Sequence, residues 1–192
     1  MLKDLDYMPA SLGGAGDFSL CFIHHPYTDH APQVKEYILV LMGFHLGGVF
    51  THFLGTRRND FIEMALHHTA CIILYGGCYL FSLWEPGAVI AFCHDIADIT
   101  TCITKTLAET RAKTSVAVLF LFHMFIWFYT RCLVFPTLIW GTWSAPTDLG
   151  GPIVKITFCL LLSFLAILHY FWFSLFVKIL MKFVREGSTE DE

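Results

Sequence analysis

Five long apolar runs dominate the sequence and restrict the folds that it can adopt. They cover roughly residues 36–54, 61–82, 87–105, 115–135 and 153–181. Each run is about as long as the ~20 residues that an α-helix needs to cross the hydrocarbon core of a bilayer. Only the third run is weakly apolar. The sequence therefore predicts an all-α integral membrane protein with about five transmembrane helices.

Composition supports this class and excludes others. The chain has 192 residues, of which 56% are apolar and 15% charged, and its mean hydropathy is +0.61. It is too apolar for a soluble domain and short enough to be one membrane domain. The formal charge of -4 includes no basic block, so we expect no nucleic-acid partner. The seven cysteines lie mostly inside apolar runs and are expected to act as small buried hydrophobes.

Three segments follow from this pattern. We expect an irregular interfacial segment at 1–34, a transmembrane domain at 35–184 and an acidic tail at 185–192. The first segment lacks the apolar core of a secretory signal and the arginines of a mitochondrial presequence. Lysine and arginine cluster after the first, third and fifth runs, whereas the loops after the second and fourth carry none. The positive-inside rule therefore predicts a cytosolic C-terminus.

Four ionisable residues inside the second and third runs are the main candidates for a catalytic site: His67, His68, Asp95 and Asp98. A charged group at bilayer depth costs roughly 2.5–3.5 kcal/mol and usually faces a partner, a cavity or a substrate. At 1.5 Å per residue, His67 and Asp98 each lie about 10 Å below the basic ends of their helices. Hydrogen bonds between helices would explain one such group, but four at one depth favour an interior site.

The chemistry of these residue types points to acid–base or nucleophilic work. A carboxylate can fix the tautomer of a histidine and stabilise its imidazolium form. Adjacent His67 and His68 point about 100° apart on a helix, so we expect one to enter the site and the other to support it. Further candidate substrate-binding residues are His94 on the polar stripe of the third run, Arg131 in the fourth, and His169 and Trp172 in the aromatic part of the fifth.

Metal binding is the alternative reading of the same residues. Membrane di-iron enzymes carry clustered HxxHH-type boxes, and the sequence contains none. We therefore predict a site without a metal and without a cofactor. A zinc-dependent membrane amidase, with two or three histidines and one aspartate as ligands, remains a minor alternative.

Several motifs together resemble the TLC domain of ceramide synthases over residues 36–192. They are, in order, RRNDFIEMALHHT, HDIADITTCITK, RCLVFP, LHYFWFSLFVKIL and EGSTEDE. The resemblance implies a helical barrel that transfers an acyl group from acyl-CoA, as co-substrate, to the amine of a sphingoid base in the endoplasmic reticulum membrane. It matches His67 and His68 to the family's histidine pair, and Asp95 and Asp98 to its paired aspartates. Lys105 and Arg111 would then meet the CoA phosphates.

Two departures from the family motivate a second hypothesis. The helix pair that ordinarily precedes the first span has no counterpart, so we expect an incomplete, N-terminally shortened barrel. Cys102 also stands where the family usually places a glutamate. The alternative function is therefore a non-catalytic, lipid-binding accessory subunit of a larger membrane complex, for example of respiratory-chain type in the mitochondrial inner membrane. Other membrane subunits or further copies of the chain would then be its partners, besides membrane lipids.

Overall fold

A computed structural model describes residues 6–23, 25–27, 32–55, 60–108, 113–145 and 149–186. Within these ranges the chain forms helices and no strands, which confirms the predicted all-α class. The long elements are α1 (Pro32–Leu54), α2 (Phe61–Leu80), α3 (Trp84–Ala108), α4 (Lys113–Trp127), the π-helical turn η4 (Phe128–Val134), α5 (Phe135–Ser144) and α6 (Pro152–Glu186).

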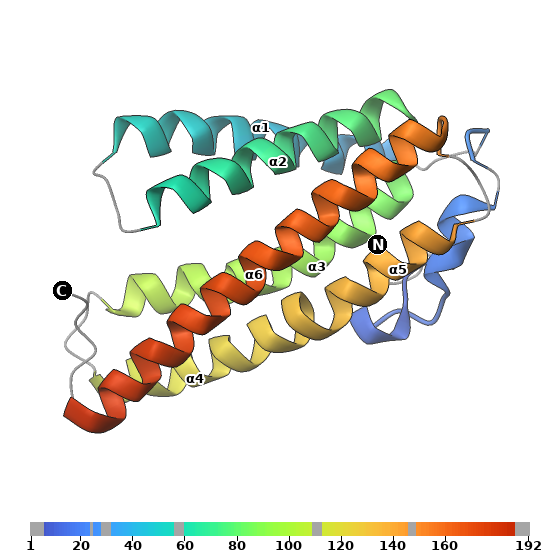
Figure 1. Ribbon diagram of the computed structural model, residues 1–192. Helices are drawn as coiled ribbons and strands as arrows, with labels where there is room; N and C mark the ends of the chain where they lie inside the picture. Colours follow the sequence, from blue (N-terminus) through green and yellow to red (C-terminus); the bar gives the residue numbers. More distant parts are fainter. Residues whose placement is uncertain are drawn as a thin grey trace.

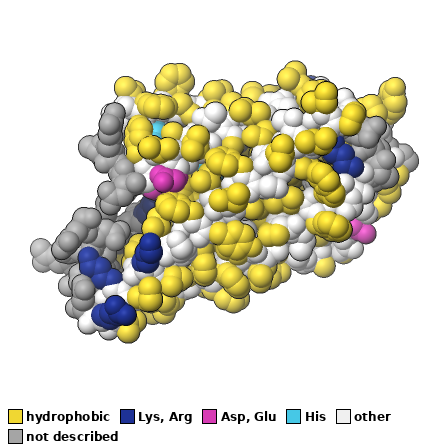
Figure 2. All heavy atoms as spheres, viewed as in Figure 1, with side chains coloured by type: hydrophobic (Ala, Val, Ile, Leu, Met, Phe, Trp, Pro, Cys, Tyr) yellow, Lys and Arg dark blue, Asp and Glu magenta, His cyan; other side chains and the backbone are white. Residues whose placement is uncertain are grey.

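Five helical segments are long and apolar enough to cross a membrane, as predicted. An α-helix satisfies its own backbone hydrogen bonds, so it can cross lipid without exposing unpaired polar groups. Figure 2 shows hydrophobic side chains over most of one long side of the molecule, with lysine and arginine near its two ends. The segments are Pro32–Leu54, Phe61–Leu80, Trp84–Leu107, Ser115–Ser144 and Pro152–Arg185.

The helices pack into one bundle around α3 (Figure 1). Helices α1 and α2 lie side by side, and α3 contacts both of them as well as α4, η4 and α5. Helix α6 crosses the bundle obliquely, packing against α2 and against η4 and α5. The buried residues of α3 are mostly small, which lets neighbouring helices approach closely and explains why the weakly apolar third run is central: Gly87, Ala88, Ala91, Cys93 and Ala97.

The fourth span is longer than predicted because a π-helical turn lets the helix continue past Pro136. We expected the span to end near residue 135, but it continues through α5 to Ser144. In the π-helical turn the Phe135 N–H bonds to the Thr130 carbonyl. Pro136 follows directly at the start of α5, where the missing N–H of proline costs little. Trp140 and Trp143 therefore lie on a helix.

The described part of the N-terminal segment covers one end of the bundle. Two short 3-10 helices, η2 (Ala10–Leu12) and η3 (Phe18–Phe22), follow one another, and the Ser19 N–H donates to the Asp17 carboxylate at 2.9 Å. Helix η3 packs against α3 and α5. Phe18 and Phe22 are buried, so this segment contributes to the core.

Two adjacent glycines of α2 provide a test of the α2–α6 packing. A Cβ at Gly77 would lie 2.7 Å from Cζ of Phe158, whereas a Cβ at Gly76 would meet nothing within 4 Å. Gly77→Ala should therefore lower the free energy of unfolding by about 1–3 kcal/mol through overpacking. Gly76→Ala should be neutral or stabilising by up to ~1 kcal/mol, since alanine favours a helix. Thermal unfolding in detergent measures both, and equal effects would contradict the packing.

Candidate active site

The site is built around Arg131, which the π-helical turn carries into the bundle. Its side chain is only 1% exposed. One guanidinium nitrogen, Nη2, donates to Asp98 Oδ1 at 2.5 Å and to the His94 carbonyl at 3.1 Å. The other, Nη1, donates to His169 Nε2 at 2.9 Å, and the guanidinium lies 4.6 Å from the Trp127 ring centroid. A buried charge needs such pairing, so Arg131 neutralises an internal anion and joins α3, η4 and α6.

These contacts determine which nitrogen of two histidines carries the proton. Arginine has donors only, so His169 Nε2 accepts, the ring is neutral, and its proton lies on Nδ1. His94 Nδ1 lies 2.7 Å from the Ile90 carbonyl and must donate, so a neutral His94 has its lone pair on Nε2. The two ring centroids are 4.9 Å apart. Among the described residues, neither His169 Nδ1 nor His94 Nε2 has a hydrogen-bond partner.

The histidine pair of α2 divides between two environments. His67 is buried, and its Nε2 lies 3.6 Å from Cys71 Sγ. Its Nδ1 is also buried, without a partner on the part of the chain that the structure describes. The His67 ring centroid is 5.4 Å from Trp172 and 6.4 Å from His169. His68 is half-buried and instead contacts His45 of α1, with 3.1 Å between the two Nδ1 atoms.

The two aspartates of α3 point to different helices. Asp98 is paired with Arg131, and Asp95 accepts a hydrogen bond from the Tyr37 hydroxyl of α1. Within the described ranges, no hydrogen bond joins either carboxylate to His67 or His68. The direct carboxylate–histidine contact that we expected is therefore not formed. The physical reason is that the buried guanidinium of Arg131 requires a counter-ion, and Asp98 supplies it.

Some of the other predicted substrate-binding residues lie in the same buried group, and some do not. Trp172 is buried, and its indole N–H has no acceptor among the described residues. Lys105 lies exposed in the last turn of α3, away from the buried centre. Arg111 lies outside the described residues. The structure thus gathers five buried residues and the half-exposed Asp98 into one group, hereafter the polar centre: His67, His94, Asp98, Arg131, His169 and Trp172.

Sequence reasoning missed two neighbours of His67. Cys71 lies one turn further along α2, and His45 comes from α1; ligand atoms of these three buried residues all lie within 4.8 Å of one another. Two imidazoles and a thiolate are donors that Zn²⁺ accepts. The i, i+4 spacing of His67 and Cys71 was visible in the sequence, but the approach of His45 depends on how α1 packs.

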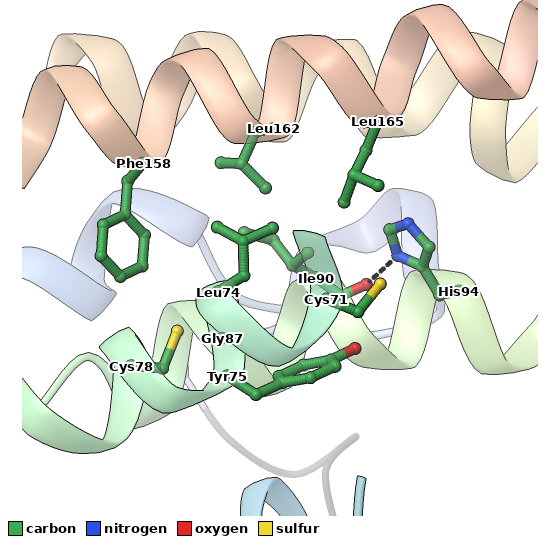
Figure 3. Close-up of a pocket in the computed structure, with 10 residues that line it drawn as sticks. All are labelled: Cys71, Leu74, Tyr75, Cys78, Gly87, Ile90, His94, Phe158, Leu162 and Leu165. Atoms are coloured by element: carbon green, nitrogen blue, oxygen red, sulfur yellow. Dashed lines mark hydrogen bonds between the residues drawn. The ribbon is translucent and has the colours of Figure 1, made fainter. Parts of the chain in front are cut away.

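A narrow apolar cavity of about 20 Å³ borders the polar centre (Figure 3). His94 lies at one end of the view, bonded to the Ile90 carbonyl, and Phe158 lies at the other end. A space of this size holds about one water molecule, but its walls are almost wholly hydrocarbon and sulfur. The lining comes from α2, α3 and α6: Cys71, Leu74, Tyr75, Cys78, Gly87, Ile90, His94, Phe158, Leu162 and Leu165.

Fold and site together define a multi-spanning helical membrane protein with a buried imidazole and guanidinium centre. Residues 8–178 match the TLC domain family. The chain belongs to this family.

Curated ceramide synthases from three organisms are similar to this chain over most of its length. Ceramide synthase 4 of Mus musculus is 31% identical over 176 residues, which cover 90% of this chain and 45% of the relative. Ceramide synthase hyl-2 of Caenorhabditis elegans is 28% identical over 188 residues, with 91% and 57% covered. Ceramide synthase LOH1 of Arabidopsis thaliana is 28% identical over 171 residues, with 83% and 54% covered. The chain thus spans about half the length of these curated relatives.

Proposed function

We propose that the chain transfers an acyl group from a long-chain acyl-CoA to the primary amine of a sphingoid base. The observation that carries this proposal is a buried imidazole nitrogen, Nδ1 of His67, that has no partner among the described residues. Such a nitrogen is available to react with a carbonyl carbon. The match to proteins named ceramide synthases supports the choice of substrates.

The reaction can be written in two balanced steps. His67 attacks the thioester carbonyl carbon; the C–S bond breaks, and the imidazole proton leaves with the sulfur as the free thiol of CoA. The amine then attacks the acyl-imidazole; the amide C–N bond forms, the bond to His67 breaks, and one amine proton returns to the imidazole. We assign His67 as nucleophile rather than only as base because its burial excludes water, which would hydrolyse an acyl-imidazole.

The surroundings suit the proposed substrates. The apolar cavity beside His94 is lined by groups that an alkyl chain can contact, although its volume requires α2 and α6 to separate before a chain enters. We assign Lys105, which is exposed in the last turn of α3, to a phosphate of CoA. We place the protein in the endoplasmic reticulum membrane, among membrane lipids. The relatives favour neither the accessory-subunit hypothesis nor the zinc amidase.

A direct assay tests this function. The protein, reconstituted in nanodiscs, is mixed with acyl-CoA labelled in the acyl group and a long-chain base. We expect labelled ceramide and free CoA to form in equal amounts. An N-acetylated base is the matched control, because its nitrogen cannot attack and should give no product. Absence of transfer by both the purified chain and its native assembly would refute the proposal.

We also predict that the polar centre works without a metal. The proposed reaction needs a free nitrogen on His67, and a metal held by His45, His67 and Cys71 would occupy that imidazole. A structural metal site is normally saturated, so it would give about one equivalent of metal. For a metal-free site we expect elemental analysis to find zinc or iron on the order of 0.1 equivalent or less. A chelator should leave acyl transfer unchanged. Stoichiometric zinc that is lost in Cys71→Ala would contradict the prediction.

A further inference from the structure

We propose that His169 binds the carbonyl oxygen of the acyl thioester through its Nδ1–H, with Arg131 behind it as the source of positive charge. The inference deepens the proposed acyl transfer and rests on it. It assigns to His169 the stabilisation of the negative charge that develops on that oxygen when the carbonyl carbon is attacked. Enzymes that transfer acyl groups need such a donor.

The proton on Nδ1 follows from the contact on the other side of the ring. Arg131 Nη1 lies 2.9 Å from His169 Nε2 and can only donate. His169 is 0% exposed, and its Nδ1–H finds no acceptor among the residues that the structure describes. A buried N–H that is orphaned in this way costs free energy. Anchoring Arg131 requires only Nε2, so a purely structural role for His169 leaves this donor unexplained.

The electrostatics favour an oxygen that becomes negative. Arg131 donates into the same ring, and chains of hydrogen bonds polarise one another, so the His169 Nδ1–H is a stronger donor than that of an isolated imidazole. The indole N–H of Trp172 and the Nε–H of Arg131 are further buried donors with no acceptor in the described ranges. His94 cannot replace His169, because its Nδ1–H is bound to the Ile90 carbonyl and its Nε2 is an acceptor when neutral.

The distance to the nucleophile is compatible with one carbonyl group between the rings. The ring centroids of His67 and His169 are 6.4 Å apart. An attacking nitrogen approaches the carbon at about 3–3.5 Å, and the donor lies about 2.7–3.1 Å from the oxygen. One carbonyl can therefore lie against both rings.

Two substitutions separate the proposed role from a structural one. His169→Asn places an amide donor near the position of Nδ1 but removes the acceptor for Arg131. His169→Gln places an amide oxygen near Nε2, keeping that acceptor, but removes the Nδ1 donor. In single-turnover acyl transfer, we expect His169→Gln to be roughly 10²–10³-fold slower than wild type. We expect His169→Asn to be faster than His169→Gln but slower than wild type, because it keeps a donor and loses the polarisation by Arg131. The opposite order would show that anchoring Arg131 is what matters and would overturn the inference.

An infrared measurement on the wild-type protein keeps the inference testable if a variant does not fold. The probe is a thioether ketone analogue of acyl-CoA, ¹³C-labelled at the carbonyl, in which a methylene between sulfur and carbonyl prevents cleavage. We expect its bound C=O band to lie below its position in hydrocarbon solvent, and to move back in folded His169→Gln. An unshifted band in wild type would overturn the inference while leaving the proposed function intact. Failure of the analogue to bind would also overturn the inference, whereas the transfer assay alone decides the proposed function.

Discussion

Acyl transfer is expected to fall by about 10³-fold or more when His67 is replaced by alanine, because loss of a nucleophile removes the covalent route altogether. The substitution also leaves a cavity beside Cys71 and Trp172, so folding is checked by gel filtration and thermal unfolding. Mass spectrometry after rapid quenching should find the acyl group on the α2 peptide of wild type when the amine is omitted. The adduct should be absent from His67→Ala.

His52 offers a matched control for this experiment. It is another histidine of the membrane domain, but its Nε2 donates to the Phe61 carbonyl at 2.8 Å and its ring stacks on Phe61. His52→Ala should therefore keep acyl transfer near the wild-type level. A folded His67→Ala protein with the activity of His52→Ala would remove His67 from the mechanism.

The largest effect on stability is expected at Asp98. The substitution Asp98→Ala removes the counter-ion of the Arg131 guanidinium. The Arg131 side chain is 1% exposed, whereas that of Asp98 is 48% exposed, so the cation that is left unpaired is the buried partner. Removing one partner of a fully buried ion pair costs about 3–5 kcal/mol, and because Asp98 is half-exposed we expect a loss toward the lower end of that range. Unfolding in detergent with increasing denaturant should show this loss.

A double substitution tests whether the cost comes from the stranded charge. Adding Arg131→Met to Asp98→Ala removes the cation as well, and replacing both partners of a buried pair by apolar groups is often close to neutral. We expect the double variant to be more stable than Asp98→Ala alone, even though the His94 carbonyl and His169 Nε2 lose a donor. Simple additivity of the two effects would show that the charges are not coupled.

Hydropathy was sufficient to predict the class and the number of spans. Apolar length alone placed the five membrane segments, except for the end of the fourth. The cost of ionisable groups in lipid singled out His67 and Asp98: His67 is buried, whereas Asp98 is half-exposed and pairs with the buried Arg131. The angle between consecutive helical residues predicted that His67 and His68 would part. These inferences are local, since each depends on a single helix and on its length or periodicity.

The contacts between side chains of different helices were not predicted, because they depend on which helices are neighbours. Hydropathy does not say that α1 reaches α3, so the bond from Tyr37 to Asp95 was invisible. Nor does it say that Arg131 meets Asp98, which is 33 positions away in the sequence. We expected Arg131 to bind substrate, and the apolar pattern of the fourth run gave no indication of its buried partners. The π-helical turn was not predictable from apolar periodicity.

That turn has a consequence for how the fourth span tolerates change in length. A π-helical turn accommodates one residue more than an α-helical turn, and each residue of an α-helix advances the side-chain direction by about 100°. Helix α5 is therefore out of phase with α4 by about one residue. A single-residue deletion within Phe128–Val134 would bring the two halves into phase and rotate either Arg131 or the α5 face that packs on α6. Insertions and deletions at this one place are thus coupled to the polar centre.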